Sequence, residues 1–172
     1  TALEGWICSV EGLPALTRGA LEELQLGRLN ELLAREKRRG GFYRGLPDRI
    51  GGLDELAGLP FTTPDELAKS GASMLLTSTA EVQRIISGTT SGTTGLAKRV
   101  FYTRRDLEHT VGFFAAGISE LVARGDRVLV AMPFSGPNGL GELICRAIIS
   151  LGAHPVPVGV GVPLGRLDEI LD

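Results

Sequence analysis

Two short apolar runs in the last third of the sequence, separated by a helical pattern, restrict the possible fold most. The runs are "DRVLVAMPF" (126–134) and "AHPVPVGV" (153–160), and residues 138–151 between them have the apolar spacing of a helix. A buried strand, a crossover helix and a second strand predict a βαβ unit with parallel strands and a right-handed connection. Ligands of such sheets bind beyond the carboxyl ends of the strands, where this chain has "PFSGPNGLG" (133–141).

A long amphipathic helix is predicted near the start of the chain. Residues 18–39 carry leucines at helical spacing, with Thr17 as a candidate N-cap and Gly40 as the stop. Four basic residues lie in the last turns, where they suit the helix dipole: Arg35, Lys37, Arg38 and Arg39. We interpret them as a solvated helix end rather than as a nucleic-acid surface.

A second helix start is visible in "TTPDEL". Thr63 can cap, Pro64 fits the first helical position, and Glu66 completes a capping box. Strand-like patterns begin only after this region. We therefore divide the chain into a helical N-terminal segment, residues 1–80, and an α/β subdomain, residues 81–172, and expect one truncated domain overall.

Two strand-like segments follow, "VQRIIS" (82–87) and "KRVFYT" (98–103), at a hairpin-like distance. Thr103, with Asp106 three residues later, predicts the capped start of a helix that runs to about Ala123. The two strands would fix both ends of the glycine- and threonine-rich loop between them.

Composition and charge exclude several classes of protein. Hydrophobic residues make up 43% of the 172 residues and charged residues 22%, which is typical of a packed globular protein and not of a disordered one. The formal charge of −2 provides no global basic field for nucleic acid or an anionic membrane. No apolar run approaches the roughly 20 residues of a membrane-spanning helix. We expect a cytoplasmic protein with neither nucleic acid nor membrane as a partner.

The cysteines and histidines do not form a recognisable catalytic or metal-binding pattern. Cys8 and Cys145 lack CxxC spacing, so neither a disulfide framework nor a zinc site is predicted, and no other metal ligands are assigned. Cys145 lies in an apolar helical pattern and is interpreted as a small core residue. His109 and His154 are interpreted as structural or exposed.

The loop 88–98 carries the strongest chemical signal, "TSGTTG". Its glycines allow successive backbone N–H groups to converge on an anion. The hydroxyls of Ser91, Thr93 and Thr94 add hydrogen-bond donors, and bonds to a charged partner contribute roughly 1.5–3 kcal/mol each. Lys98 follows as a mobile cation for the outer phosphates of a nucleotide.

Other interpretations of the glycine-rich segments are weaker. No Gly-Lys-Ser/Thr follows the spacer of a Walker A loop, and the GxGxxG fingerprint of a Rossmann fold is absent. "GVGVPLG" (159–165) misses that fingerprint by one spacing and is interpreted as a loop. A hairpin turn or linker with a chance repeat is the remaining alternative for "GTTSGTTG", although a bare linker is rarely followed by Lys-Arg and an apolar strand.

"TSGTTGLAK" resembles the phosphate-binding signature of adenylate-forming enzymes, which include acyl-CoA synthetases, luciferases and peptide-synthetase adenylation domains. Within that superfamily the chain is most similar to phenylacetate–CoA ligases and coenzyme F390 synthetases. The resemblance covers nearly the whole chain, with segments in the same order: "LQLGRLNELLAREKRRGGFYRGL", "LDELAGLPFTTPDEL", "SGTTG", "YTRRDLE" and "GLGELICRAIISLGAHPVPV". It implies an α/β fold: a helical N-terminal segment, then a partly parallel βαβ sheet, as an incomplete adenylate-forming N-terminal domain.

The resemblance also implies a reaction and a set of site residues. A carboxylic acid, with an aromatic acid as one option, would react with ATP in the presence of Mg²⁺ to give acyl-AMP, and coenzyme A would then displace AMP. Lys98 would assist catalysis, and Phe134 lies where the family has an aromatic residue near the acyl pocket. The residues that would clasp the β- and γ-phosphates are Thr90, Ser91, Gly92, Thr93, Thr94 and Gly95.

Two departures from the family pattern limit this expectation. Ala97 replaces a proline of the signature, and "AMPFSGPNGLG" departs from the family around Phe134. The later motifs for adenine, ribose and magnesium and the mobile C-terminal domain are absent. We therefore expect a fragment, inactive alone, whose partner is the remaining part of the enzyme or a second copy in a dimer. The alternatives are one half of a split enzyme and a non-catalytic module that binds nucleotide or a partner.

Overall fold

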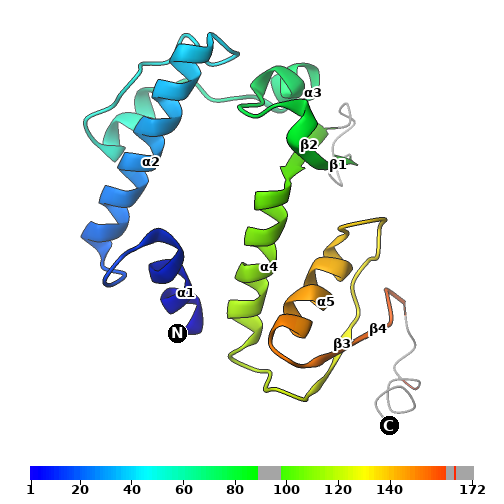
Figure 1. Ribbon diagram of the computed structural model, residues 1–172. Coiled ribbons are helices and arrows are strands. Elements are labelled where there is room, and N and C mark those ends of the chain that lie inside the picture. Colours follow the sequence, from blue (N-terminus) through cyan, green and yellow to red (C-terminus); the bar gives the residue numbers. More distant parts are fainter. Residues whose placement is uncertain (89–97, 162–164, 166–172) are drawn as a thin grey trace. The chain divides into compact units, whose positions relative to one another are not determined.

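The computed structural model describes residues 1–88, 98–161 and 165 (Figure 1). By contacts the chain divides into two compact units, one of Thr1–Gly12 with Tyr102–Asp172 and one of Leu13–Phe101. The mixture of helices and small sheets confirms the predicted α/β class.

The predicted division of the chain at residue 80 follows the sequence pattern and stays a prediction. In the part of the chain with described placement, no helix is both long and apolar enough to cross a bilayer.

The first unit contains the predicted βαβ arrangement. Strand β3 (Arg127–Val130) pairs in parallel with β4 (His154–Pro157), with Arg127 opposite His154 and Val130 opposite Pro157. Helix α5 (Leu140–Ser150) is the crossover between them and packs on both strands. The parallel pairing and the crossover helix are confirmed.

Both strands are shorter than the sequence pattern predicts. The last bond of the ladder runs from the Val158 N–H to the Val130 carbonyl, at 3.1 Å. Pro155 and Pro157 alternate with the residues of β4 that donate to β3, so they leave the ladder intact and remove donors only from the other side of β4. The chain after Val130 instead turns into a loop that leads to α5.

The core of this unit lies where α5 covers the two strands. Val130, Ile148 and Ala153 are each at most 4% exposed and form one buried cluster. The partly buried side chains packed against it are Ile118, Val122, Val128, Met132, Ile144 and Cys145. The predicted strands and helix therefore contribute apolar side chains to a single core.

Helix α4 (Arg104–Ile118) begins as predicted and ends earlier than predicted. Thr103 and Asp106 form a reciprocal capping box, in which the Thr103 N–H donates to the Asp106 carboxylate at 2.8 Å. The expectation of a helix to about Ala123 was wrong. After Ile118 the chain continues as turns, and the Asp126 carboxylate accepts the N–H of Ala123 at 2.8 Å. That N–H is therefore bonded to a side chain instead of to a helical carbonyl.

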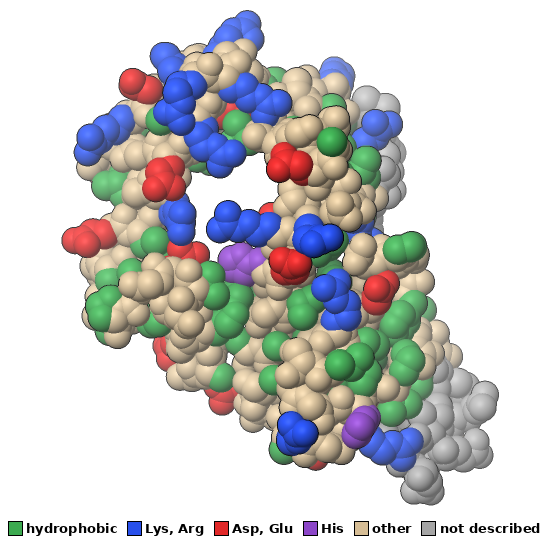
Figure 2. All heavy atoms as spheres, in the orientation of Figure 1, with side chains coloured by type: hydrophobic (Ala, Val, Ile, Leu, Met, Phe, Trp, Pro, Cys, Tyr) green, Lys and Arg blue, Asp and Glu red, His purple; other side chains and the backbone are tan. Residues whose placement is uncertain are grey.

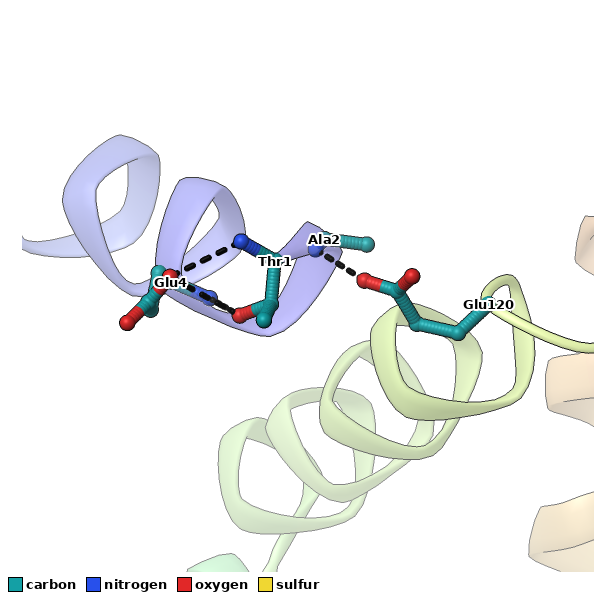
Figure 3. A network of polar contacts seen from close by, with 4 residues as sticks. All are labelled: Thr1, Ala2, Glu4 and Glu120. Atoms are coloured by element: carbon teal, nitrogen blue, oxygen red, sulfur yellow. Dashed lines mark hydrogen bonds and ion pairs between the residues drawn. The ribbon is translucent and has the colours of Figure 1, made fainter.

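An additional helix, α1 (Ala2–Glu11), packs against α4 in the same unit. Thr1 and Glu4 form its capping box, and the Ala2 N–H donates to the carboxylate of Glu120 just beyond α4 (Figure 3). Trp6 lies against α4, with its ring 4.9 Å from that of His109. The Thr-x-x-Glu pattern at Thr1 and Glu4 is the sequence signal for this helix.

The second unit is built around α2 (Arg18–Arg39), whose bounds match the prediction. Thr17 accepts the N–H of Ala20 at 3.2 Å, and Gly40, at φ 65°, ends the helix in the left-handed conformation. The basic residues at this end are exposed, and Figure 2 shows Lys and Arg side chains gathered over the end of α2. Of these, Arg39 donates to the backbone carbonyl of Leu75.

Helix α3 (Pro64–Ser70) confirms the second predicted start. Thr63 accepts the N–H of Glu66 at 3.2 Å, and the Glu66 carboxylate accepts the N–H of Thr63 at 2.8 Å. These hydrogen bonds, first from the Thr63 backbone and then from its hydroxyl, lower the pKa of Glu66. The cap is therefore present in its charged form at neutral pH.

A side chain in the middle of α2 fixes the loop that follows the helix. The Asn30 amide oxygen accepts the Ile50 N–H at 2.8 Å, and the Asn30 amide nitrogen donates to the Ile50 carbonyl at 3.0 Å. Ile50 is only 3% exposed, so its backbone groups have little access to water. One amide thus replaces the two hydrogen bonds that a strand neighbour would supply.

Asn30→Ala is expected to lower the free energy of unfolding by about 2 kcal/mol, since it leaves a buried N–H and a buried carbonyl without partners. Gln25→Ala is the matched control, because Gln25 is exposed on the same helix and its loss is expected to change stability by less than about 0.5 kcal/mol. Urea denaturation of the variants measures both values. Equal losses would contradict the role assigned to Asn30.

Candidate functional site

The predicted phosphate-binding loop joins two neighbouring strands. Strands β1 (Val82–Gly88) and β2 (Lys98–Thr103) are neighbours in a two-stranded sheet, as the sequence predicts. Residues 90–95, the predicted phosphate ligands, lie outside the described residues. Lys98 begins β2, but its side chain also lies outside the description. The assignments of these residues stay predictions, and only the strands that flank the loop are described.

The other predicted position, Phe134, lies in the loop between β3 and α5, at the carboxyl end of β3. Two backbone hydrogen bonds of 3.1 Å close this loop, from the Gly141 N–H to the Pro133 carbonyl and from the Gly139 N–H to the Gly136 carbonyl. Among the residues the structure describes, Asn138 alone has a positive φ without being glycine, at 59°. Non-glycine residues in this conformation are strained and often lie at functional sites.

The start of α5 has an unusual cap that holds Asn138. Gly139 is the N-cap and makes no side-chain hydrogen bond. A Cβ at this position would lie 3.0 Å from the Gly136 carbonyl oxygen and 3.0 Å from the Ser135 nitrogen, so a serine or threonine cap does not fit without a shift. The Glu142 carboxylate instead accepts the N–H of Asn138, at 2.7 Å. The acidic charge also suits the positive end of the helix dipole.

A second contact reaches Asn138 from the next turn of α5. Arg146 donates through Nη1 to the Asn138 amide oxygen at 3.3 Å. Asn138 is therefore bonded through its backbone to Glu142 and through its side chain to Arg146. We call these three residues the Asn138 clasp. Two separate hydrogen bonds thus hold Asn138 in the left-handed conformation before α5. Such a conformation persists when the surrounding structure fixes it in this way.

The ring of Phe134 rests against the first turn of α5 at Gly141. A Cβ on Gly141 would lie 2.8 Å from Cε2 and 2.9 Å from Cζ of this ring. The Phe134 side chain is nevertheless 44% exposed, so the rest of the ring is open at the carboxyl edge of the strands. Ligands of parallel sheets collect at this edge. The assignment of Phe134 to the acyl pocket stays a prediction.

Neither Cys145 nor the histidines add a reactive group to this edge. Burial, and secondarily the charge of Glu142, raise the pKa of the Cys145 thiol, so it stays protonated at neutral pH. The side chain packs against the core, which agrees with its interpretation as a small core residue. His109 lies on α4 and His154 begins β4, both exposed.

The described residues include no group of three or more acidic, histidine or cysteine side chains placed to hold a metal ion. The second unit has a cavity of about 810 Å³ between the first turns of α2 and the 3₁₀ helix η1 (Leu53–Gly58). Its charged lining residues are Arg18, Glu22, Glu23 and Asp54. Because acidic side chains outnumber basic ones there, the cavity does not suit a phosphate chain.

The Asn138 clasp and the Gly141 contact were not identified from the sequence. The Asn-Gly pair at 138–139 indicates a turn with positive φ, and Glu142 is three residues after Gly139, where a capping acid is expected. These two signals together could have identified the capped turn. No sequence pattern indicates which ring would lie on Gly141.

Comparison with known proteins identifies the class of fold. No family model matches this sequence, and no curated protein matches it. Among solved structures, the fold is that of part of an acid–CoA ligase, 2-hydroxyisobutyryl-CoA ligase. One structure of that ligase, in complex with 2-HIB-AMP and CoA in the thioesterification state, has a TM-score of 0.65 and 23% identity, over 87% of this chain and 34% of the ligase.

An open conformation of the same ligase, also with 2-HIB-AMP and CoA, has a TM-score of 0.64 and 20% identity, over 87% of this chain and 37% of the ligase. The chain therefore spans about a third of the length of the ligase that it resembles. The similarity supports the ligase fold expected from the sequence. It does not single out the phenylacetate–CoA ligases, and that finer assignment remains a proposal.

Proposed function

We propose that this chain is the N-terminal portion of an AMP-forming acyl- or aryl-CoA ligase. One combined observation carries the proposal: "TSGTTGLAK" connects two neighbouring strands in a chain whose fold resembles a third of an acid–CoA ligase. In the proposed reaction a carboxylate oxygen of the acid attacks the α-phosphorus of ATP. The α–β phosphoanhydride bond breaks and pyrophosphate leaves. The thiol of coenzyme A then attacks the acyl carbon, and AMP leaves.

The proposed role of the loop is to bind the leaving pyrophosphate. Ser91, Thr93 and Thr94 would donate hydroxyl hydrogen bonds, and the glycines between them would leave backbone N–H groups free to approach the phosphates. Lys98 would neutralise charge on the outer phosphates as the phosphoanhydride bond breaks. Hydroxyls, amides and one ammonium group suit a polyphosphate anion, so this donor set fits ATP. Such a step is promoted by positioning and by charge stabilisation.

The remaining components of the reaction are assigned on the resemblance alone. Mg²⁺ would be bound with the phosphates of ATP and would neutralise part of their charge. Coenzyme A is the proposed acceptor. The acid is proposed to lie beside Phe134 at the carboxyl edge of β3, where the exposed part of the ring could contact an alkyl or aryl group. The order of segments shared with phenylacetate–CoA ligases favours an aromatic acid. A cytoplasmic location is proposed on a different ground, the cysteine pattern, which fits a reducing compartment.

The second candidate is a non-catalytic module that binds nucleotide or a partner protein, or one half of a split enzyme. It applies if the remaining two thirds of the ligase fold belong to another polypeptide or are not needed, since the chain spans about a third of the length of its structural relatives. In this case the loop would still bind a nucleotide, but adenylation would require residues from a second polypeptide.

ATP–pyrophosphate exchange tests the proposal. We expect acid-dependent exchange from the full-length protein that carries these residues, tested with a panel of alkyl and aryl acids. We expect no exchange from the 172-residue chain alone, because the motifs expected for adenine and ribose are not in it. Nucleotide binding without exchange in the full-length protein would favour the non-catalytic module. Strong exchange by the isolated chain would contradict the expectation that it is incomplete.

A further inference from the structure

We propose that Gly141 determines the size of the acid that the proposed ligase accepts. Because Gly141 has no side chain, the ring of Phe134 can lie directly against the first turn of α5. This inference rests on the proposed function and names a specificity-determining residue within it. It arises from the contact between one glycine and one aromatic ring, and from the hydrogen bonds that hold the surrounding loop.

The contact leaves no room for any side chain at position 141. A Cβ on Gly141 would lie 2.8, 2.9 and 3.0 Å from three carbons of the Phe134 ring. Real Cβ atoms essentially never approach another atom closer than 3.0 Å. An aromatic ring is rigid, so it cannot accommodate the extra carbon by bending and must move as a whole. The ring would have to leave its present place on α5.

The backbone does not require a glycine at this position. Gly141 lies inside α5 and does not have a positive φ, so other residues could adopt its conformation. Glycine is normally unfavourable inside a helix. Gly117 in α4 shows the contrast, because a Cβ there would have nothing within 4 Å. The ring of Phe134 is thus the described feature that makes glycine necessary at position 141.

Hydrogen bonds at both ends of the loop oppose a movement that would relieve the contact between a side chain at position 141 and the Phe134 ring. The Gly141 N–H is bonded to the Pro133 carbonyl at 3.1 Å, directly beside Phe134 in the chain. The Asn138 clasp holds the other end of the loop. There the Asn138 N–H donates to the Glu142 carboxylate at 2.7 Å, and Arg146 donates to the Asn138 amide oxygen at 3.3 Å. With both ends of the loop held, a ring displaced from Gly141 must rotate toward its open side.

That open side is where the acid is proposed to bind. The Phe134 side chain is 44% exposed, and the loop lies at the carboxyl edge of the parallel strands. A ring rotated outward would take space from the acyl group and none from the carboxylate, which must reach ATP. Bulky acids should therefore lose activity while short ones keep it. The relevant substrate class is carboxylic acids graded by the size of the group next to the carboxyl carbon.

The experiment compares Gly141→Ala with wild type in the full-length protein. ATP–pyrophosphate exchange is measured with acetate, butyrate, phenylacetate and 4-phenylbutyrate. We expect the ratio of kcat/KM for phenylacetate to that for acetate to fall at least tenfold, through a higher KM for the bulky acid, with the KM for ATP unchanged. A merely structural role would lower activity with all four acids alike.

Three further variants make the result specific. Gly117→Ala is the matched control, a helical glycine replaced in open space, and should leave the ratio unchanged. Phe134→Leu in the Gly141→Ala background should restore most of the ratio, because the smaller, flexible side chain avoids the added carbon. If Gly141→Ala does not fold, Phe134→Ala alone carries the test, and it should raise the relative activity with 4-phenylbutyrate.

The outcomes separate this inference from the proposed function. Exchange by the wild type with an unchanged ratio in folded Gly141→Ala would overturn the role of Gly141 and leave the ligase function intact. An unchanged acid preference in Phe134→Ala would overturn it as well. No exchange by the wild type with any acid would overturn the proposed function, and the role of Gly141 with it. A shifted ratio that Phe134→Leu restores supports both.

Discussion

Replacing Ser91, Thr93 and Thr94 together by alanine is expected to weaken ATP binding on the order of a thousandfold. Each hydroxyl is proposed to donate to a charged phosphate oxygen, and bonds of this kind contribute roughly 1.5–3 kcal/mol each. Three at the lower limit amount to about 4.5 kcal/mol, and each 1.4 kcal/mol corresponds to about a tenfold change in affinity. Isothermal titration of the full-length protein with ATP and Mg²⁺ measures the loss.

The matched control replaces two hydroxyls that lie outside the loop. Thr110 and Ser119 donate to the carbonyls of Asp106 and Ala116, within and just after α4, at 2.8 Å each. Their replacement by alanine should leave the ATP affinity within about twofold. A loop variant that binds ATP as tightly as the wild type would contradict the phosphate-binding role. It would favour the interpretation of "GTTSGTTG" as a simple turn.

Ile148→Ala is expected to lower the free energy of unfolding by about 3 kcal/mol. Ile148 is 0% exposed and lies at the centre of the cluster with Val130 and Ala153. Removal of a large aliphatic side chain from a packed core typically costs about 2–5 kcal/mol, from lost burial and from the cavity left behind. Val130 in β3 and Ala153, directly before β4, would lose the buried side chain with which they cluster. Urea denaturation followed by circular dichroism measures the change.

The neighbouring residue in the same helix supplies the control. Ile149 is 60% exposed, and Ile149→Ala removes the same atoms from a site that faces water. Its expected cost is below about 1 kcal/mol, since little burial is lost and alanine is a better helix former. If the two variants were equally destabilised, the core would not lie where α5 meets the strands.

The elements with strong local signals could be predicted from the sequence. The bounds of α2 follow from Thr17, the leucine spacing and Gly40, and its N- and C-terminal caps are local features of the chain. The starts of α3 and α4 follow from capping boxes in the same way. Parallel pairing of β3 with β4 is a long-range feature, but a crossover helix between two apolar runs leaves few alternatives.

The ends of elements were harder to predict because they depend on competition between nearby hydrogen bonds. Helix α4 stops at Ile118, and the Asp126 side chain takes the N–H of Ala123 that a longer helix would have used. Strand β3 stops at Val130 although its apolar pattern continues. In both cases the hydrophobic pattern extends further than the backbone hydrogen bonds do.

The candidate site was predicted only in part, for a different reason. The loop residues and Phe134 were identified by resemblance, whereas Gly141, Asn138 and Glu142 were not. Their importance depends on where side chains point in the folded loop: the ring of Phe134 toward the helix, and the Glu142 carboxylate back toward the turn. Side-chain direction of this kind requires the conformation of the loop, which spacing alone does not provide.

The loop before α5 also bears on how this protein could be engineered. The cap, the left-handed turn and the ring contact of this loop, from the Pro133 carbonyl to the Arg146 guanidinium, join residues within one short continuous stretch of the chain. A grafted segment that carries residues 133–146 as a block would bring its own cap, turn and ring contact. Single exchanges at Asn138, Gly139 or Glu142 would separate partners that depend on one another. Libraries that vary this stretch as one cassette should therefore retain more folded members than libraries that vary its positions independently.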